Sequence, residues 1–567
     1  MPRAWIAVAG LALLGLSWNL GGYPLIEPDE GRNVQIAREM VRGGDWVLPH
    51  LDGLPYLDKP APFFATVAVG LAVLGESEAS ARSASLVFVL ATVFVVWRLG
   101  RRMGPPGTGA IAAVALATMP LMLAYSRTVI PDPALLFFET GALAAAWCGF
   151  AAAPAARRWF ALSWALLGLG VVIKGPVAVI VPLLILAAWG VAAGVRLRPY
   201  FAPGNWPWAL ATALPWLIAV SMRRPDFPYY AVVLESLERV ATPVYGRTEP
   251  FWYFVPILLA GSFPWVVPAI AGLVRALQWR AARRSEAGRA PAFAIAWVLV
   301  PLVFFSFSES KLPGYILPAL PGVALGAALV FAAALRDHAA GATAVRSVRV
   351  AAGLLLSLAL AALVAPRVVA DLPKLAPGVR EAIPAFARVA AGVLAAAAGF
   401  AAWAARRHNV WGATASLALP IALTPFAGAS LMRAIGHDRS SLDLAAAIER
   451  SARGARVVAV ATYPTSLRYY LDRPVLMTTI NGEEMTSHYI GSRFAEFSAL
   501  PNSPLRPVDW WRAELDACAE PTVFVVRDDS PQAAILAARL PRIASGGAGG
   551  RFTAYGPCRT HAAAVTP

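Results

Sequence analysis

Long apolar runs separated by short polar loops fill the chain up to about residue 432. A membrane-spanning helix needs about 20 predominantly apolar residues, and thirteen stretches fit that pattern. The apolar stretch 60–76 is short and opens with two prolines, so we expect an interfacial or re-entrant helix there. The predicted spans are 4–22, 83–99, 107–124, 133–152, 159–173, 175–194, 207–222, 251–273, 291–307, 313–334, 350–366, 385–404 and 410–432.

The pattern changes after residue 435. S-S-L-D-L-A-A-A-I-E-R predicts a helix with a serine cap, and V-V-A-V-A-T, P-V-L-M-T-T and T-V-F-V-V-R-D are short β-branched runs typical of strands. We therefore predict two domains: a transmembrane domain over 1–435 and a small α/β domain over 436–567. The polar segment 23–82 is predicted to be an external loop with juxtamembrane helices.

Composition and charge agree with a polytopic α-helical membrane protein. The chain is 58% hydrophobic and only 14% charged, whereas soluble domains carry roughly 25% charged residues. Its net charge of +16 lies in short tracts such as R-L-G-R-R and A-R-R-H between apolar runs, which is typical of cytoplasmic loops. This distribution predicts membrane lipids, not nucleic acid, as partners, and places the C-terminal domain outside the cytoplasm.

The three cysteines are too few for a disulfide framework. Cys148 lies in an apolar run, where we expect it to pack. Cys518 and Cys558 fall in the C-terminal region and pair there if that region is periplasmic. Two unpaired thiols are the equally open alternative.

Lysine is rare in this arginine-rich chain, and its four positions are informative. Lys59, Lys174, Lys311 and Lys374 all map to the predicted external side, and three of them stand beside proline or glycine at a helix edge. Lysine is a compact donor that binds phosphate well. Retention by chance at lipid headgroups is the simpler alternative.

Acidic residues gather on the same predicted side. Asp29 and Glu30 follow the first span, Asp132 follows the third, and Glu235 and Glu238 lie in Y-Y-A-V-V-L-E-S-L-E-R-V. Ionisable groups at a membrane edge are costly and tend to be functional. Carboxylates that orient an acceptor, beside cations that hold a phosphate leaving group, suit transfer from a lipid-linked donor. For Asp29 alone, a helix N-cap is the alternative.

Longer motifs resemble a known family. The stretch E-P-D-E-G-R-N-V-Q-I-A-R-E-M-V-R-G-G-D-W-V-L-P-H-L-D-G-L-P-Y-L-D-K-P looks like the first external loop of the aminoarabinose transferase and protein mannosyltransferase-like family. R-T-V-I-P-D-P, I-K-G-P, L-E-R-V-x(6)-G-R-T-E-P-F-W-Y and F-S-x-S-K-L-P-G-Y-I-L-P-A-L-P resemble the same family in the same order, over about residues 5–335. The resemblance implies a GT-C fold with about 13 transmembrane helices and a periplasmic C-terminal domain.

The resemblance also assigns residues. It implies that Asp29 is the catalytic carboxylate and Asp132 the second essential one. Residues expected around the donor phosphate are Arg32, Lys59, Lys311 and Tyr315. Supporting residues are expected to be Glu30, Arg127, Lys174, Glu238 and Arg239.

Two departures from the family pattern concern the loop and a metal. Asn33 stands where members often have tyrosine after the loop arginine. Members that bind a metal use an acid and a histidine, whereas this chain has Asp58 and Glu235 at those positions. Two carboxylates still suit a hard cation, so no cofactor is certain and a divalent cation is a candidate.

The resemblance implies an inverting glycosyltransferase in the bacterial inner membrane, with its site on the periplasmic side. The donor would be a polyprenyl-phosphate-linked sugar, and the acceptor a glycolipid such as lipid A or a polysaccharide. One alternative is a protein O-mannosyltransferase-like enzyme with a protein acceptor. Another is a transporter or flippase of a polyprenyl-linked lipid, which should carry mid-membrane charges and inverted repeats. A catalytically inactive relative is the third.

Overall fold

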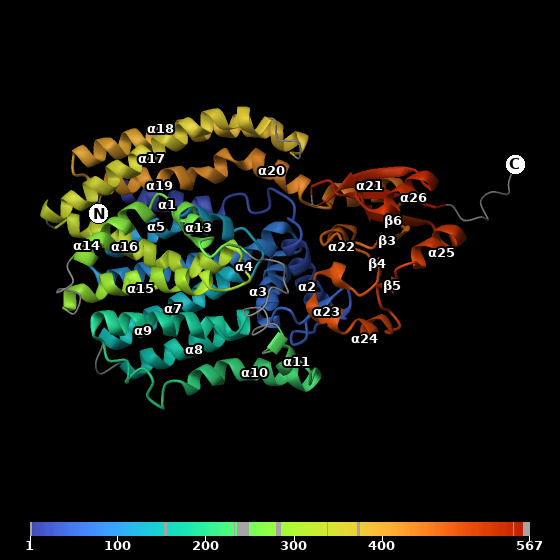
Figure 1. Ribbon diagram of the computed structural model, residues 1–567, viewed down its shortest axis with the longest axis horizontal. Coiled ribbons are helices and arrows are strands. Elements are labelled where there is room, and N and C mark those ends of the chain that lie inside the picture. The colour runs from blue at the N-terminus through green and yellow to red at the C-terminus, as the bar shows by residue number, and fades with distance from the viewer. Residues whose placement is uncertain are drawn as a thin grey trace. The chain divides into compact units, whose positions relative to one another are not determined.

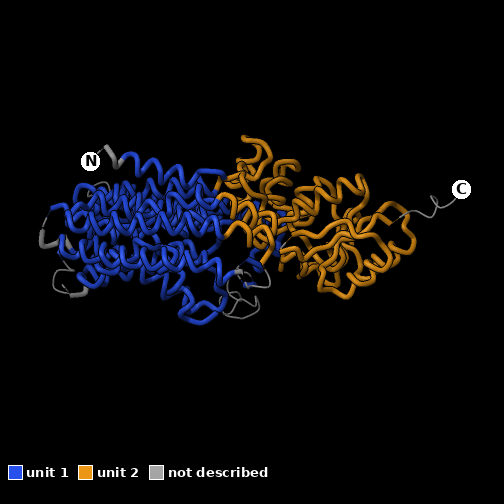
Figure 2. Tube along the Cα trace, turned by 90° about the horizontal axis from the view of Figure 1, so that it is seen from above, with its two compact units in different colours: residues 1–19, 85–371, 384–428 blue, residues 20–84, 372–383, 429–567 orange. Residues whose placement is uncertain are grey.

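The structure is a computed structural model that describes residues 3–151, 156–231, 233–234, 249–278, 285–336, 338–370, 375–547 and 549–558. The chain divides into two compact units, coloured separately in Figure 2. We call residues 1–19, 85–371 and 384–428 the helical unit, and residues 20–84, 372–383 and 429–567 the mixed unit. These two units are defined by contacts between residues, whereas the predicted boundary at residue 435 separates a transmembrane domain from an external domain. Because the two divisions use different criteria, the boundary at residue 435 stays a prediction.

Every predicted span coincides with one helix or with a pair of consecutive helices (Figure 1). The helices that lie in or extend into the helical unit are α1 (Arg3–Ser17), α4 (Glu78–Met103), α5 (Thr108–Ala117), α6 (Pro120–Tyr125), α7 (Asp132–Ala151), α8 (Ala156–Lys174), α9 (Val177–Ala193), α10 (Pro207–Arg223), α11 (Phe227–Tyr229), α13 (Phe254–Gly261), α14 (Val266–Gln278), α15 (Glu286–Ser306), η4 (Pro313–Ala319), α16 (Leu320–Ala334), α17 (His338–Ala370), α18 (Pro377–Arg406) and α19 (Val410–Ala427).

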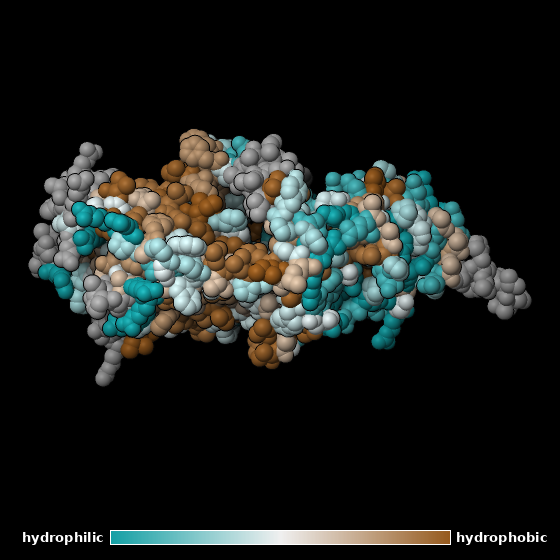
Figure 3. Space-filling view, turned by 90° about the horizontal axis from the view of Figure 1, so that it is seen from below, coloured by the Kyte–Doolittle hydropathy of each residue, from teal (hydrophilic) through white to brown (hydrophobic). Residues whose placement is uncertain are grey.

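The chain is an integral membrane protein, although the predicted number of spans is not confirmed. Within the described residues, eight helices are long and apolar enough to cross a membrane, or nine if α13 and α14, bent by 113°, are one span. Prolines account for part of the difference, because Pro120 begins a new helix after α5 and proline cannot continue the hydrogen-bond ladder. Figure 3 shows hydrophobic residues gathered over the helical unit.

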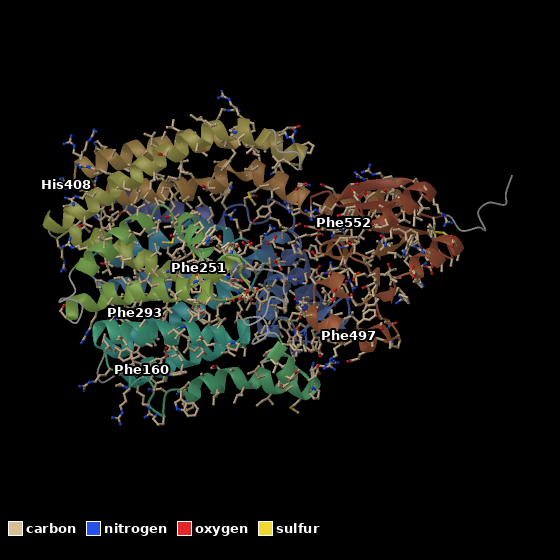
Figure 4. All side chains as sticks on the ribbon, viewed as in Figure 1. Phe160, Phe251, Phe293, His408, Phe497 and Phe552 are labelled. Atoms are coloured by element: carbon tan, nitrogen blue, oxygen red, sulfur yellow. A yellow bond between two sulfur atoms is a disulfide. The ribbon has the colours of Figure 1, made fainter. Side chains whose placement is uncertain are left out.

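Aromatic side chains fill the core of the helical unit. Trp147 of α7, Trp189 of α9 and Phe293 of α15 lie with ring centroids 5.1–5.3 Å apart. Phe160, labelled with Phe293 in Figure 4, packs on Phe150 at 4.9 Å. Because lipid is as apolar as these side chains, close packing stabilises such a bundle more than burial does.

The mixed unit joins the first loop to the C-terminal sheet region. Its elements are α2 (Asp29–Gly43), β1 (His50–Leu51), β2 (Leu54–Pro55), α3 (Ala61–Leu74), the start of α4, α20 (Ala429–Asp438), α21 (Leu442–Ser451), β3 (Arg456–Val460), α22 (Leu467–Leu471), β4 (Val475–Thr479), η5 (Glu483–Met485), α23 (His488–Ser492), α24 (Phe494–Ser498), β5 (Leu505–Pro507), α25 (Trp510–Ala517), β6 (Thr522–Arg527), α26 (Pro531–Arg539), β7 (Arg542–Gly546) and β8 (Phe552–Tyr555).

The predicted small α/β region after residue 435 is confirmed. Its sheet has the order β5-β4-β3-β6-β8-β7, parallel from β5 to β6 and antiparallel at β8 and β7. Strand residues alternate between faces: Val457 and Ala459 pack with α21 and α22, whereas Val458 and Val460 pack with α25 and α26. Helices therefore cover both faces of the sheet.

A disulfide joins Cys518 to Cys558 and closes a loop across β6, α26, β7 and β8. We expect the double variant Cys518→Ser/Cys558→Ser to lose about 4 kcal/mol of unfolding free energy, because cross-linking residues 40 apart restricts the unfolded chain. Chemical unfolding of the purified protein, with and without reductant, measures the loss. Reductant should lower the wild-type midpoint and leave the double variant unchanged; a wild-type midpoint insensitive to reductant would contradict the prediction.

Candidate active site

Asp29 is the first residue of α2, and an arginine one turn along holds its carboxylate. Its Oδ1 accepts a hydrogen bond from Nη2 of Arg32 at 2.5 Å, and the spacing of three residues places both side chains on one face of the helix. The Asp29 side chain is 58% exposed, whereas that of Arg32 is 9% exposed. The N-cap position of α2 is Pro28 and Asp29 is the first residue inside the helix, so Asp29 is not its N-cap.

Arg32 hydrogen-bonds to polar groups from two distant parts of the sequence. Its Nη1 donates to Oγ1 of Thr486 at 2.6 Å, and its Nε makes no hydrogen bond with the described residues. Burial alone lowers the pKa of Arg32, but the nearby Tyr56, Asp29 and Asp58 together raise it above its ordinary value. The guanidinium is therefore a buried, charged donor beside two of the predicted site carboxylates.

Glu30 has a different role from its neighbour Asp29. Its two oxygens accept from Nε and Nη2 of Arg82 at 3.0 and 2.7 Å, and both side chains are almost fully buried. Arg82 also donates to the backbone carbonyls of Leu20, Tyr23 and Pro24 at 2.6–2.9 Å. Glu30, predicted as a supporting residue, thus ties the start of α2 to the loop before it. Sequence reasoning missed Arg82, although an arginine at the edge of an apolar run was a signal.

Glu27 fastens the same loop to the C-terminal part of the unit. Its Oε1 accepts from the hydroxyls of Ser441 and Ser466 at 2.6 and 2.7 Å, and from the Ser466 amide at 3.0 Å. The serine cap predicted from sequence for α21 is wrong: its N-cap residue, Ser441, donates its hydroxyl to Glu27 and makes no side-chain capping hydrogen bond. A Cβ on Gly31 would lie 2.7 Å from the Ser466 nitrogen, so only glycine allows this approach.

Asp58 is also tied to the C-terminal part of the mixed unit. Its Oδ1 accepts from the Tyr489 amide at 3.0 Å, and the residue is buried. Lys59 is half-buried just before α3. Among the described residues, no group of three or more His, Cys, Asp or Glu side chains forms a metal site. The predicted residues Glu235, Glu238 and Arg239 lie outside the described part of the chain.

In the helical unit, Asp132 meets a lysine and a tyrosine. Its Oδ1 accepts from Nζ of Lys174 at 2.7 Å, joining the first residue of α7 to the last of α8. The same Nζ lies 4.9 Å from the centroid of the Tyr315 ring, which belongs to η4. The structure thus brings together Asp132, Lys174 and Tyr315, which are 183 residues apart at most in sequence. Their side chains form a charged cluster at helix ends.

Lys311 and Arg127 lie in the same unit with backbone partners. Nζ of Lys311 donates to the Ser308 carbonyl at 2.5 Å, and the residue is buried. Nη2 of Arg127 donates to the carbonyls of Gly15, Leu16 and Trp18 at 2.8–3.3 Å. Because the last carbonyls of a helix lack intrahelical partners, Arg127 satisfies the end of α1.

Glu139 is a buried acid outside the predicted set of site residues. It lies two turns after Asp132 on α7, interacts electrostatically with Lys174 and Asp132, and is 2% exposed. Neither carboxylate oxygen hydrogen-bonds to the described residues. Because ionisable groups inside a membrane bundle are costly, Glu139 is a candidate functional residue of α7.

Gly314 tests the geometry around Asp132. We expect Gly314→Ala to lower the activity of this site by about a hundredfold, because the new Cβ would lie 2.7 Å from both Oδ1 of Asp132 and the Tyr125 hydroxyl and would displace the carboxylate. Gly326→Ala in α16 is the matched control, since its Cβ would find its nearest neighbour at 3.7 Å. Steady-state kinetics of the two variants measure the effect, and equal activities would contradict the prediction.

The arrangement of membrane helices followed by a sheet region, with acids and lysines at helix ends, defines a class of fold, which comparison with solved structures identifies. ArnT from Cupriavidus metallidurans bound to undecaprenyl phosphate superimposes with a TM-score of 0.82 and 25% identity over 98% of each chain. In its apo state the TM-score is 0.80 with 26% identity, over 97% of each chain. The chain therefore has the GT-C fold.

Sequence comparisons agree. Residues 58–222 match the family model described as dolichyl-phosphate-mannose-protein mannosyltransferase. Undecaprenyl phosphate-alpha-4-amino-4-deoxy-L-arabinose arabinosyl transferases are 32% identical over 330 residues in Edwardsiella ictaluri and 34% over 325 residues in Pseudomonas aeruginosa. The matches cover 57% and 55% of this chain and a little over half of those relatives, 58% and 57%. The predicted resemblance to the aminoarabinose transferase and protein mannosyltransferase-like family is confirmed.

Proposed function

We propose that this protein is an inverting glycosyltransferase that moves a sugar from a polyprenyl-phosphate-linked donor to a glycolipid acceptor, with lipid A as the leading candidate. The relatives are named arabinosyl transferases that use an undecaprenyl-phosphate sugar, and the similar ArnT structure contains undecaprenyl phosphate. A polysaccharide acceptor is the next candidate within the same reaction.

The pairing of Asp29 with Arg32 is the observation that carries the proposal. An exposed carboxylate can reach an incoming hydroxyl, whereas the buried guanidinium keeps a charged N–H donor for an anion. A purely structural ion pair would not need this asymmetry; Glu30 and Arg82 show what such a pair looks like in the same loop.

The proposed reaction is a single displacement. Asp29 accepts the proton of the acceptor hydroxyl while that oxygen bonds to the anomeric carbon. The bond from this carbon to the phosphate oxygen breaks on the opposite face, which inverts the configuration and releases polyprenyl phosphate. Positive charge at Arg32 and Lys59 stabilises the departing phosphate. For Lys311 and Tyr315, which belong to the helical unit, a role at the phosphate stays a prediction from sequence.

Asp132 and Lys174 complete the proposed assignment. Asp132 is the second essential carboxylate, and its ion pair with Lys174 fixes its orientation at the start of α7. Because both side chains are mostly buried, at 13% and 16% exposed, the pair is held more firmly than a surface salt bridge. The roles of Glu238 and Arg239 stay predictions from sequence.

We place the protein in the bacterial inner membrane with the mixed unit on the periplasmic side. The arginine-rich short loops support this orientation. The Cys518–Cys558 disulfide supports it as well, because disulfides persist in oxidising compartments and are rare in the cytosol.

A divalent cation at Asp58 and Glu235 also stays a prediction. Asp58 already interacts with the guanidinium of Arg32, and that positive charge would repel a cation bound beside it. Transfer measured after treatment with a chelator, and again after adding back Mg²⁺, Mn²⁺ or Zn²⁺, tests for metal dependence. Unchanged turnover would remove the metal from the proposal.

A transfer assay with purified protein in lipid tests the proposed function. The assay offers a panel of polyprenyl-phosphate sugars together with total membrane lipid, and separately with a Ser- and Thr-rich peptide. Sugar appearing in lipid supports the proposal and identifies the donor. Sugar appearing on the peptide would favour the protein mannosyltransferase alternative, which the matching family model supports. No turnover, with lipid crossing the bilayer, would favour a transporter.

A further inference from the structure

Two of the buried arginines of the mixed unit, Arg82 and Arg32, differ sharply in their hydrogen bonding. A guanidinium carries five N–H donors. In Arg82, Nε, Nη1 and Nη2 together make five hydrogen bonds, two to Glu30 and three to backbone carbonyls. In Arg32, one bond goes to Asp29, one goes to Thr486, and Nε bonds to none of the described residues. A buried N–H donor without a partner is costly, so an acceptor that reached Nε of Arg32 would be stabilised there.

Thr486 fixes one side of the Arg32 guanidinium from 454 residues away in sequence. It follows η5 and has a φ of 53°, in the left-handed region. A β-branched residue in this conformation is a genuine outlier that costs free energy, and such outliers gather at functional sites. Asparagine or glycine would adopt this turn more easily, but neither offers a hydroxyl.

The segment around Thr486 is held from several sides. Met485 is 1% exposed, the Ser487 hydroxyl caps α23 by accepting from the Ile490 amide at 3.2 Å, and the Tyr489 amide donates to Asp58. The Tyr489 ring packs against Phe497, which is labelled in Figure 4, with centroids 6.0 Å apart. The hydroxyl of Thr486 is therefore presented from a fixed backbone rather than from a free loop.

We propose that Thr486 is a positioning residue for phosphate binding: its hydroxyl and the Asp29 carboxylate hold the two terminal nitrogens of Arg32, so that Nε–H faces a phosphate oxygen of the donor lipid. The proposal deepens and rests on the proposed function. It gives the C-terminal part of the mixed unit a direct role in donor binding.

Substitutions at Thr486 separate this role from folding. Thr486→Val keeps the shape and removes the hydroxyl, and Thr486→Ser keeps the hydroxyl. Thr486→Gly removes the hydroxyl but relieves the left-handed backbone, so this variant should unfold no more easily than the wild type. Thr424→Val is the matched control, because among the described residues the Thr424 hydroxyl bonds only to the Pro420 carbonyl of its own helix, α19, at 2.9 Å.

Direct binding of undecaprenyl phosphate, with undecaprenol as the uncharged comparison, tests the proposal without any sugar transfer. We expect Thr486→Val and Thr486→Gly to bind the phosphate lipid about tenfold more weakly, Thr486→Ser and Thr424→Val to bind it as the wild type does, and undecaprenol binding to stay unchanged in all four. Thermal unfolding in the same detergent checks that the variants are folded.

The outcomes distinguish this inference from the proposed function. Phosphate binding by Thr486→Val equal to the wild type, or equal weakening of undecaprenol, would overturn the role of Thr486. If the transfer assay shows no donor turnover but Thr486→Val still weakens phosphate binding, the glycosyltransferase proposal fails while the phosphate site stands. In an active enzyme, Thr486→Val should raise KM for the donor and leave KM for the acceptor unchanged, and a reversed pattern would also count against it.

Discussion

Replacing Asp29 with asparagine is expected to lower sugar transfer by about 10²- to 10⁴-fold, because the amide cannot accept the acceptor proton. The fold should survive. Asp29 is 58% exposed, and the amide oxygen of asparagine can still accept the hydrogen bond from Arg32. Transfer is measured with the donor found active in the panel, and thermal unfolding of both proteins is measured alongside.

Asp516→Asn provides the matched control, since it removes another exposed carboxylate that pairs with an arginine, Arg539, at the surface of the mixed unit. It should transfer sugar at the wild-type rate. If Asp29→Asn kept more than a third of the wild-type activity, Asp29 would not be the catalytic base, and the transporter and inactive-relative alternatives would gain support.

Replacing Arg82 with leucine is expected to cost about 3–5 kcal/mol of unfolding free energy, because it leaves the buried Glu30 carboxylate without its partner. Three backbone carbonyls before α2 also lose their donor. Denaturant unfolding in detergent measures the loss. Adding Glu30→Leu to this variant should recover part of the stability, since the buried charge is then gone.

Arg42→Leu is the control for this stability effect. Arg42 pairs with Glu76 and Asp472, but its side chain is 49% exposed, and exposed ion pairs contribute about 0–1 kcal/mol. If Arg82→Leu and Arg42→Leu unfolded at the same denaturant concentration, the buried pair would not organise the loop as described. Two neighbouring residues of α2 are therefore expected to have different roles: Asp29 affects activity, and Glu30 together with Arg82 affects stability.

The amino-acid sequence was sufficient for several features of this protein. Apolar runs located the membrane helices, because transfer of about 20 apolar residues into lipid is decided locally. Short β-branched runs located β3, β4 and β6, because the preference of such residues for strands is also visible locally. The loop motifs identified Asp29, Arg32 and Asp132 as candidates, and the resemblance they carry was confirmed. The predicted number of spans was not confirmed, because several predicted spans form helices of 10–17 residues and Pro120 begins a new helix after α5.

Only the tertiary structure decided what each charged residue does. Glu27, Asp29 and Glu30 are nearly adjacent in sequence, yet Glu27 binds Ser441 and Ser466, Glu30 binds Arg82, and Asp29 stays exposed beside Arg32. Thr486 carries no motif, and its bond to Arg32 joins residues 454 positions apart. Hydropathy and spacing report on a residue and its near neighbours along the chain. The partner that satisfies a buried charge is chosen by the fold, so it becomes visible only when distant segments are in contact.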